Sequence, residues 1–182
     1  MRSSAMRDMM AITARPEIIS LAGGLPDTST FPVDAFVAEM DRIASGKVPE
    51  VLQYGPTEGL QLVRDQITEV MLAEQMHVDV ADVTVTTGGQ QAIDLITKVL
   101  IDPGDILICD APTYPGAIPP FCSHEAEIIQ LESGAAGMRI DLLEQTLAEL
   151  AERGRKPKFI YSVPTFQNPG GVTLSLERRQ QL

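Results

Sequence analysis

The stretch Phe159-Ile160-Tyr161-Ser162-Val163 runs directly into Pro164-Thr165-Phe166-Gln167-Asn168-Pro169-Gly170-Gly171. Its first five residues are an apolar run typical of a buried strand, and a helix start follows at Ser175. A polar amide between two prolines, at the carboxyl end of such a strand, stands where open α/β sheets place their ligand contacts. The same residues also fit an ordinary Asn-Pro turn between a strand and a helix. The rest of the chain has to decide between these two interpretations.

Strand and helix patterns alternate from Asp82 onward. Besides 159–163, three runs of β-branched or apolar residues are predicted as strands: 83–87, 106–109 and 128–131. Helices are predicted over 90–101, where little charge on any face indicates cover on more than one side, and from a capping box at Asp141-x-x-Glu144 to a stop at Gly154. This alternation predicts an α/β fold, a mostly parallel sheet flanked by helices with right-handed crossovers.

The first 80 residues follow a different pattern. Residues 1–30 have no clear period. Helices are predicted over 33–44 and 59–76, on either side of the polar segment Gln53-Tyr54-Gly55-Pro56-Thr57.

The composition excludes several classes of protein. The 182 residues are 44% hydrophobic and 21% charged, as in a globular domain with its own core. A net charge of −11 leaves no basic stripe for phosphates, so we expect no nucleic-acid partner. No apolar run approaches the roughly 20 residues that span a bilayer, and the N-terminus lacks the apolar core of a signal peptide. Two cysteines and two histidines form neither a disulfide framework nor a metal site, so we expect a cytoplasmic protein with no membrane partner and no metal.

Two more segments leave predicted strands at the edge of the sheet that carries Asn168. Thr87-Gly88-Gly89-Gln90 joins a strand end to a helix start, where free N–H groups form an anion site. It matches neither of the common nucleotide-binding fingerprints, and by itself a tight turn is its simpler interpretation. Asp110-Ala111-Pro112-Thr113-Tyr114-Pro115-Gly116 holds one tyrosine ring rigidly, as a stacking platform requires, although a ring packed over a loop would have the same sequence.

The combination of the three segments is more informative than any one of them. An anion site, an aromatic ring and an amide at one edge of a parallel sheet suit a flat, phosphorylated, aromatic cofactor. Its phosphate would lie at 88–90, its ring against Tyr114 and its phenolic oxygen at Asn168.

These motifs, in this order, resemble the fold-type I pyridoxal-phosphate aminotransferases, and most of all the kynurenine/α-aminoadipate aminotransferase group. The resemblance covers essentially the whole chain. It rests on five segments: Ile18-Ile19-Ser20-Leu21-Ala22-Gly23-Gly24-Leu25-Pro26, Leu52-Gln53-Tyr54-Gly55-Pro56, Thr86-Thr87-Gly88-Gly89-Gln90-Gln91, Ala111-Pro112-Thr113-Tyr114 and Phe166-Gln167-Asn168-Pro169.

The resemblance implies a role for each matching residue. Gly88, Gly89 and Gln90 would hold the phosphate of pyridoxal 5'-phosphate, Tyr114 would stack on its ring, and Asn168 would hydrogen-bond its phenolic oxygen. Relatives commonly have a serine where Gly89 stands, so one hydroxyl donor to the phosphate is lost. Gly170 likewise replaces a usual Thr or Ser, which should loosen the turn after Asn168.

Further implications concern the assembly and the substrate. Tyr54 would reach the phosphate of a neighbouring subunit, so the resemblance implies a homodimer. Gly24 and Arg7 would contact the substrate. The implied domains are an arm with a small-domain segment over 1–48 and a pyridoxal-phosphate-binding large domain over 49–182.

The implied activity is transamination between an amino acid and a 2-oxo acid, with 2-oxoglutarate as the expected acceptor. The family needs a lysine that bonds the cofactor, an aspartate on the pyridine nitrogen and an arginine for the substrate carboxylate. None of the four lysines, at 47, 98, 156 and 158, has the context of that catalytic lysine. We therefore expect the chain to be the N-terminal part of such an enzyme, with no catalytic residue of its own and no activity by itself.

Three alternatives stay open at this stage. The same scaffold serves other pyridoxal-phosphate enzymes, such as lyases. It also serves as the effector domain of aminotransferase-like transcription regulators, which carry a basic DNA-binding domain in addition. The third alternative is a non-catalytic fragment.

Overall fold

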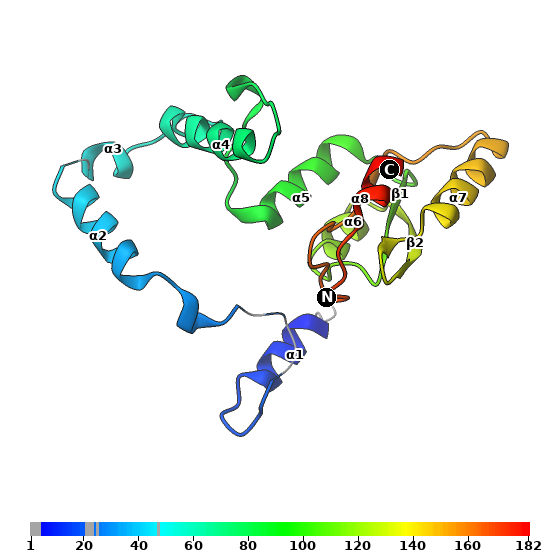
Figure 1. Cartoon of the computed structure of the whole chain (residues 1–182), viewed down its shortest axis with the longest axis horizontal. Coiled ribbons are helices and arrows are strands. Elements are labelled where there is room, and N and C mark those ends of the chain that lie inside the picture. Colours follow the sequence, from blue (N-terminus) through cyan, green and yellow to red (C-terminus); the bar gives the residue numbers. More distant parts are fainter. Residues whose placement is uncertain (1–4, 21–23, 25, 47) are drawn as a thin grey trace. The chain divides into compact units, whose positions relative to one another are not determined.

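A computed structural model of the chain describes residues 5–20, 24, 26–46 and 48–182 (Figure 1). The chain divides into two compact units, Met1–Leu25 together with Gly89–Leu182, and Pro26–Gly88. The predicted domain boundary after residue 48 concerns the complete protein and stays a prediction.

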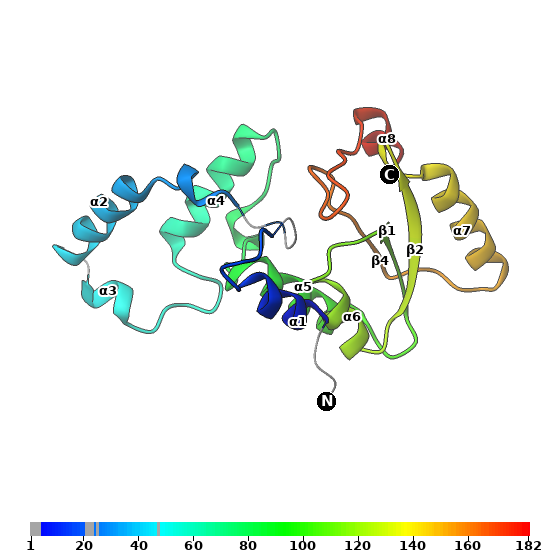
Figure 2. The same ribbon diagram turned by 90° about the horizontal axis from the view of Figure 1, so that it is seen from below.

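The larger unit is built on a sheet of four strands in the order β3-β2-β1-β4, of which β1, β2 and β4 are labelled in Figure 2. β1 pairs in parallel with both β2 and β4, and the short β3 pairs antiparallel with β2. This is the predicted α/β fold with a mostly parallel sheet. The strand bounds are β1 Ile106–Ala111, β2 Glu127–Gly134, β3 Gly137–Met138 and β4 Phe159–Tyr161.

Helices pack on both faces of this sheet because β1 is apolar on both sides. Ile106 and Ile108 face a cluster that includes Leu143 and Leu150 of α7. Leu107 and Cys109 point the other way, toward a cluster that includes Phe121 of α6. The unbroken apolar run predicted such a strand. The helices of the unit are α1 Ala5–Thr13, α5 Gly88–Leu100, α6 Ile118–Ser123, α7 Ile140–Glu152 and α8 Leu176–Gln181, of which α5 takes its first residue from the other unit.

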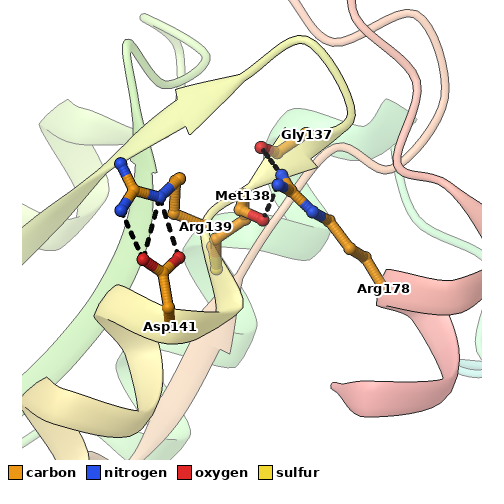
Figure 3. A network of polar contacts seen from close by, with 5 residues as sticks. All are labelled: Gly137, Met138, Arg139, Asp141 and Arg178. Carbon is orange, nitrogen blue, oxygen red and sulfur yellow. Dashed lines mark hydrogen bonds and ion pairs between the residues drawn. The ribbon is translucent and has the colours of Figure 1, made fainter.

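Two helix ends follow the prediction and one does not. Gly154, at φ +65°, ends α7, and Ser175 caps α8 by accepting a hydrogen bond from the Arg178 N–H at 3.3 Å. The predicted capping box at Asp141 is wrong, because Arg139 is the N-cap of α7 and makes no side-chain cap bond. Asp141 lies inside the first turn and instead accepts hydrogen bonds from the Arg139 guanidinium (Figure 3). That contact lowers the pKa of Asp141 to about 2.

The smaller unit is helical. Its elements are η1 Thr28–Thr30, α2 Val33–Ala44, α3 Val48–Leu52, α4 Gln61–Ala73 and η2 Val80–Asp82. The bounds of α2 are those predicted from the sequence, whereas α4 is shorter at both ends. Gly59 at φ +100° and Gln75 at φ +63° have left-handed backbone that a helix cannot continue through.

The predicted strand over 83–87 is wrong for the chain as described. These residues follow η2 as extended backbone, and the Val85 N–H donates to Glu58 O at 2.8 Å. β-branched residues favour extended backbone, but a strand also needs a neighbour to form a ladder. No strand among the described residues pairs with this segment.

Helix α5 also differs from the prediction of cover on more than one side. Thr97 is its one buried residue. Val99 is 79% exposed and Ile96 is 52% exposed. The helix is covered on one face only within the part of the chain that the structure describes.

Candidate functional site

The N-terminus of α5 provides backbone amides that have no carbonyl one helical turn earlier. The Gly88 N–H is already used, because it donates to Thr86 O at 2.8 Å. The amides of Gly89 and Gln90 are therefore the ones left for an anion, at the positive end of a 13-residue helix. A Cβ atom added at Gly88 or Gly89 would meet no atom within 4 Å, so a ligand can approach this backbone closely.

Tyr114 and Gln90 meet at Gly116. The Gln90 side-chain amide donates to Gly116 O at 2.7 Å, which ties the start of α5 to the loop after β1. A Cβ added at Gly116 would stand 2.5 Å from Cε1 of Tyr114 and 2.7 Å from Oε1 of Gln90. Only glycine fits there, because the tyrosine ring lies directly on that backbone. The half-buried ring is thus held in one place, as the stacking hypothesis requires.

Asn168 lies on the loop after β4, and the neighbouring Gln167 fastens that loop. The Gln167 side chain is buried, donates to Pro112 O at 2.6 Å and accepts from the Gly170 N–H at 2.6 Å. The first bond joins the loop after β4 to the loop after β1, which carries Tyr114. Asn168 and Tyr114 therefore belong to two connected loops at the carboxyl ends of neighbouring parallel strands.

Gly24 lies against the side chain of Asn168. Its φ of +61° is a left-handed conformation that favours glycine, and a Cβ there would stand 3.2 Å from Nδ2 of Asn168. The sequence placed these residues 144 positions apart in separate motifs, and the structure brings them into contact. The N-terminal segment thus reaches the amide predicted to bind the cofactor.

The two remaining predicted contacts are not tested by this arrangement. Tyr54 lies in the smaller unit, where it is 98% exposed. Arg7 belongs to α1, and its side chain lies outside the part of the chain that the structure describes. Lys158 forms an ion pair with Asp105 at 3.0 Å and donates its N–H to Ile106 O, at the amino end of β1. Lys158 therefore lies at the amino ends of the strands, whereas Asn168 follows their carboxyl ends.

Sequence reasoning missed Gln167 and Gly116 as residues of this site. A polar side chain directly before the Asn-Pro pair was a signal for the first of them, whereas Gly116 was counted only as a rigidifying residue beside Tyr114. Their roles depend on contacts with Pro112 and Gln90, which are 55 and 26 residues away along the chain.

Two further features of the described residues concern membranes and metals. None of the helices there is both long enough and apolar enough to cross a membrane. Among the same residues, no three His, Cys, Asp or Glu side chains are grouped so that they could hold a metal ion.

The chain is similar to proteins of one enzyme family. A family model described as aminotransferase class I and II matches residues 16–182. The chain is 40% identical over 183 residues to the aromatic-amino-acid aminotransferase 1 of Thermococcus litoralis and covers 44% of that protein. It is 36% identical over 181 residues to the 2-aminoadipate transaminase of Thermus thermophilus and covers 43% of it.

A solved structure agrees with these relatives. The kynurenine aminotransferase of Pyrococcus horikoshii, determined with PMP, superposes with a TM-score of 0.91 at 39% identity. The match covers 99% of this chain and 45% of that one. The chain thus spans less than half the length of the relatives that it matches.

Proposed function

The chain belongs to the class I and II aminotransferase family, whose members are fold-type I pyridoxal-phosphate enzymes, and from that premise we propose that the complete protein transfers an amino group between an amino acid and a 2-oxo acid. The proposed cofactor is pyridoxal 5'-phosphate, and the proposed acceptor is 2-oxoglutarate. When bound, the cofactor supplies an electron sink for cleavage of bonds at the α-carbon of the amino acid.

The observation that carries this proposal is that hydrogen bonds link three segments with different functional groups at the carboxyl ends of the strands. The helix start at Gly89 and Gln90 offers amides to a phosphate, Tyr114 offers a fixed ring, and Asn168 offers a carboxamide from the next loop. The linked loops and the open space at Gly89 fit a flat, phosphorylated ring. The lost serine hydroxyl at position 89 leaves the backbone amides as the donors to the phosphate.

Each of these residues would bind or orient rather than react. Tyr114 would hold the plane of the cofactor ring, because its own ring lies directly on the Gly116 backbone. Asn168 Nδ2 would donate to the phenolic oxygen and so favour the deprotonated form of that oxygen. Gly24, in contact with the same amide, would place the N-terminal segment beside the substrate, together with Arg7.

On this proposal, the residues that move the proton and hold the substrate carboxylate would lie outside these 182 residues. The family's lysine, aspartate and substrate-binding arginine would come from the rest of the complete protein. Within the 182 residues, the role of the chain would be to bind the phosphate, stack on the ring and hydrogen-bond its oxygen.

The complete protein would be a cytoplasmic homodimer. Tyr54 supports this proposal, because a side chain 98% exposed in its own chain is available to the phosphate of a neighbouring subunit. The arm and small-domain segment over 1–48 and the large domain beginning at 49 would then be the domains of the complete enzyme.

The relatives carry names for aromatic amino acids, 2-aminoadipate and kynurenine. On this basis we expect a broad substrate range. Gly24 supports the same expectation, because the N-terminal segment contacts the site through a glycine, and a glycine has no large side chain that would select one substrate. A preference for one amino acid by several orders of magnitude over all others would contradict breadth.

The test is a turnover assay with the complete protein. It should take up pyridoxal phosphate, show the absorbance of the bound cofactor, and form glutamate from 2-oxoglutarate with aromatic amino acids or 2-aminoadipate. Loss of the amino acid without a requirement for any 2-oxo acid would indicate a lyase. Absence of cofactor uptake would overturn the proposed function.

A further inference from the structure

The loop that carries Asn168 closes through a narrow neck. Its two limbs meet where the Leu174 N–H donates to Pro164 O at 2.8 Å. The Leu174 limb is anchored, because that side chain is 5% exposed within the core cluster on one face of the sheet. The Pro164 limb is exposed. The position of the loop tip, and with it Asn168, therefore depends on how firmly the exposed limb is held to the buried one.

The neck lacks one hydrogen bond that an ordinary antiparallel contact would have. Two facing residues of such a pair exchange N–H···O bonds in both directions. Pro164 has no N–H, so it cannot return a bond to Leu174 O. A carbonyl in that position needs another donor.

Arg179 of α8 supplies the missing donor. Its Nε donates to Leu174 O at 2.9 Å, and its Nη2 donates to Pro164 O and to Thr165 Oγ1, each at 2.9 Å. One guanidinium thus holds both limbs of the neck. A planar guanidinium holds donors on separate nitrogens in a fixed geometry, whereas a lysine ammonium carries its three donors on one nitrogen at the end of a flexible stem.

The preceding arginine offers a direct contrast. Arg178 Nη1 donates to Gly137 O at 2.6 Å and to Met138 O at 2.9 Å (Figure 3). These carbonyls belong to β3, not to the loop after β4. Two adjacent arginines on one short helix therefore fasten two different elements, and only one of them fastens the loop of Asn168.

We propose that Arg179 is a positioning residue that sets the place of the Asn168 amide by clasping the neck of its loop. The inference rests on the proposed function, because it concerns the amide that would donate to the cofactor's phenolic oxygen. Loss of the clasp leaves Leu174 O without its donor, while the Pro164 limb keeps the Leu174 N–H bond and the bond from the Phe166 N–H to Thr173 Oγ1. The neck is then held by fewer bonds, so the tip shifts and the amide loses its alignment. Gln167, which ties the tip to Pro112, keeps the loop from detaching completely.

The experiment compares Arg179→Gln and Arg178→Gln in the complete protein loaded with pyridoxal phosphate. The readout is the pH midpoint of the bound cofactor's absorbance, measured together with cofactor affinity and thermal stability. Arg179→Gln should shift the midpoint in the same direction as Asn168→Ala, by about 0.5 pH unit or more, and lower the affinity. Arg178→Gln should lower stability and leave the midpoint at the wild-type value.

A double variant shows whether Arg179 acts through Asn168. In an Asn168→Ala background, Arg179→Gln should shift the midpoint no further, because residues that act through one contact are not additive. Arg179→Lys keeps the positive charge and loses the guanidinium, so it should shift the pH midpoint by an intermediate amount. This variant replaces Arg179→Gln in the test if the glutamine variant does not fold.

The possible failures can be told apart. One outcome is that Asn168→Ala changes the pH midpoint of the cofactor's absorbance while Arg179→Gln and Arg179→Lys keep the wild-type midpoint. The proposed role of Arg179 is then overturned, and the proposed function stands. Equal shifts in the Arg178 and Arg179 variants, or full additivity with Asn168→Ala, also overturn it. A complete protein that takes up no cofactor overturns the proposed function and this inference with it.

Discussion

At the scale of single residues, the site is set by side chains that hold other side chains in place. Gln167 fastens the loop that carries Asn168 by donating to Pro112 O, and Gly116 leaves room for the ring of Tyr114 because it has no Cβ. Neither needs to touch a ligand to matter. Substitutions at such positions should change cofactor binding through geometry.

The amide of Asn168 gives the first prediction. If it donates to the phenolic oxygen, Asn168→Ala in the complete protein removes a bond that favours the deprotonated form. A charge-assisted hydrogen bond contributes about 1.5–3 kcal/mol, and one pKa unit corresponds to about 1.4 kcal/mol. The pH midpoint of the cofactor's absorbance should therefore rise by about one to two units. An unchanged pH midpoint at full cofactor occupancy would mean that Asn168 does not contact the cofactor and that the Asn-Pro stretch is only a turn.

Gly116 gives the second prediction. In Gly116→Ala the new methyl group would stand 2.5 Å from the Tyr114 ring, so the ring must move. Overpacking of this kind costs about 1–3 kcal/mol, and cofactor affinity should fall by about tenfold. Gly46→Ala is the matched control, because a Cβ there meets nothing within 4 Å. Equal affinities of the two variants would show that the ring position is unimportant.

At the scale of elements, helix α7 shows how a local contact replaces a predicted cap. Arg139 and Asp141 pair across the helix start, with Arg139 Nε 2.8 Å from Asp141 Oδ1. Both side chains are well exposed. The pairing acts on the first turn of the helix, whose apolar face packs against β1.

This pair leads to a prediction about pH. The pKa of Asp141 falls from 3.8 to about 2 in the fold, chiefly through the Arg139 hydrogen bond. The folded state therefore binds fewer protons than the unfolded state between these values, so the stabilisation is complete above pH 4 and is lost as pH falls toward 2. Asp141→Asn should flatten the decline of the unfolding temperature over that range, whereas Glu144→Gln should not. An Asp141 carboxyl that titrates in NMR near its ordinary value would contradict the pairing.

At the scale of the whole molecule, we expect the chain to hold only part of the family's catalytic residues. It spans less than half the length of its relatives, and it contains no lysine in the catalytic context. A preparation of these 182 residues with pyridoxal phosphate, an aromatic amino acid and 2-oxoglutarate should give no turnover above free cofactor. Turnover at the level of an enzyme would mean that one of its own lysines acts as the catalytic residue.

The proposed dimer allows a complementation test. A Tyr54→Phe subunit of the complete protein and a subunit without the catalytic lysine should each be impaired as homodimers. Mixed dimers should regain activity, because one of the two sites then receives Tyr54 from one chain and the lysine from the other. No recovery under conditions where subunits exchange would place Tyr54 outside the neighbouring site.

The amino-acid sequence was sufficient for what depends on local chemistry. The alternation of apolar runs and helical periods identified three of the four paired strands to within a few residues, and the bounds of α2 were correct. The glycines before α5, the Tyr114 loop and the Asn-Pro stretch were recognisable because turns and helix starts need particular residues at fixed offsets.

Only the tertiary structure decided which of these residues meet. The extended run at 83–87 has the local preference of a strand, but pairing requires a neighbour that local preference cannot supply. Three contacts of the site likewise join segments that are separate in the sequence. They are Gly24 with Asn168, Gln167 with Pro112, and Arg179 with Pro164 at the neck of the loop. The physical reason is the same in each case: a hydrogen-bond partner or a close approach is a property of packing in space, and neighbouring residues in the sequence do not specify it.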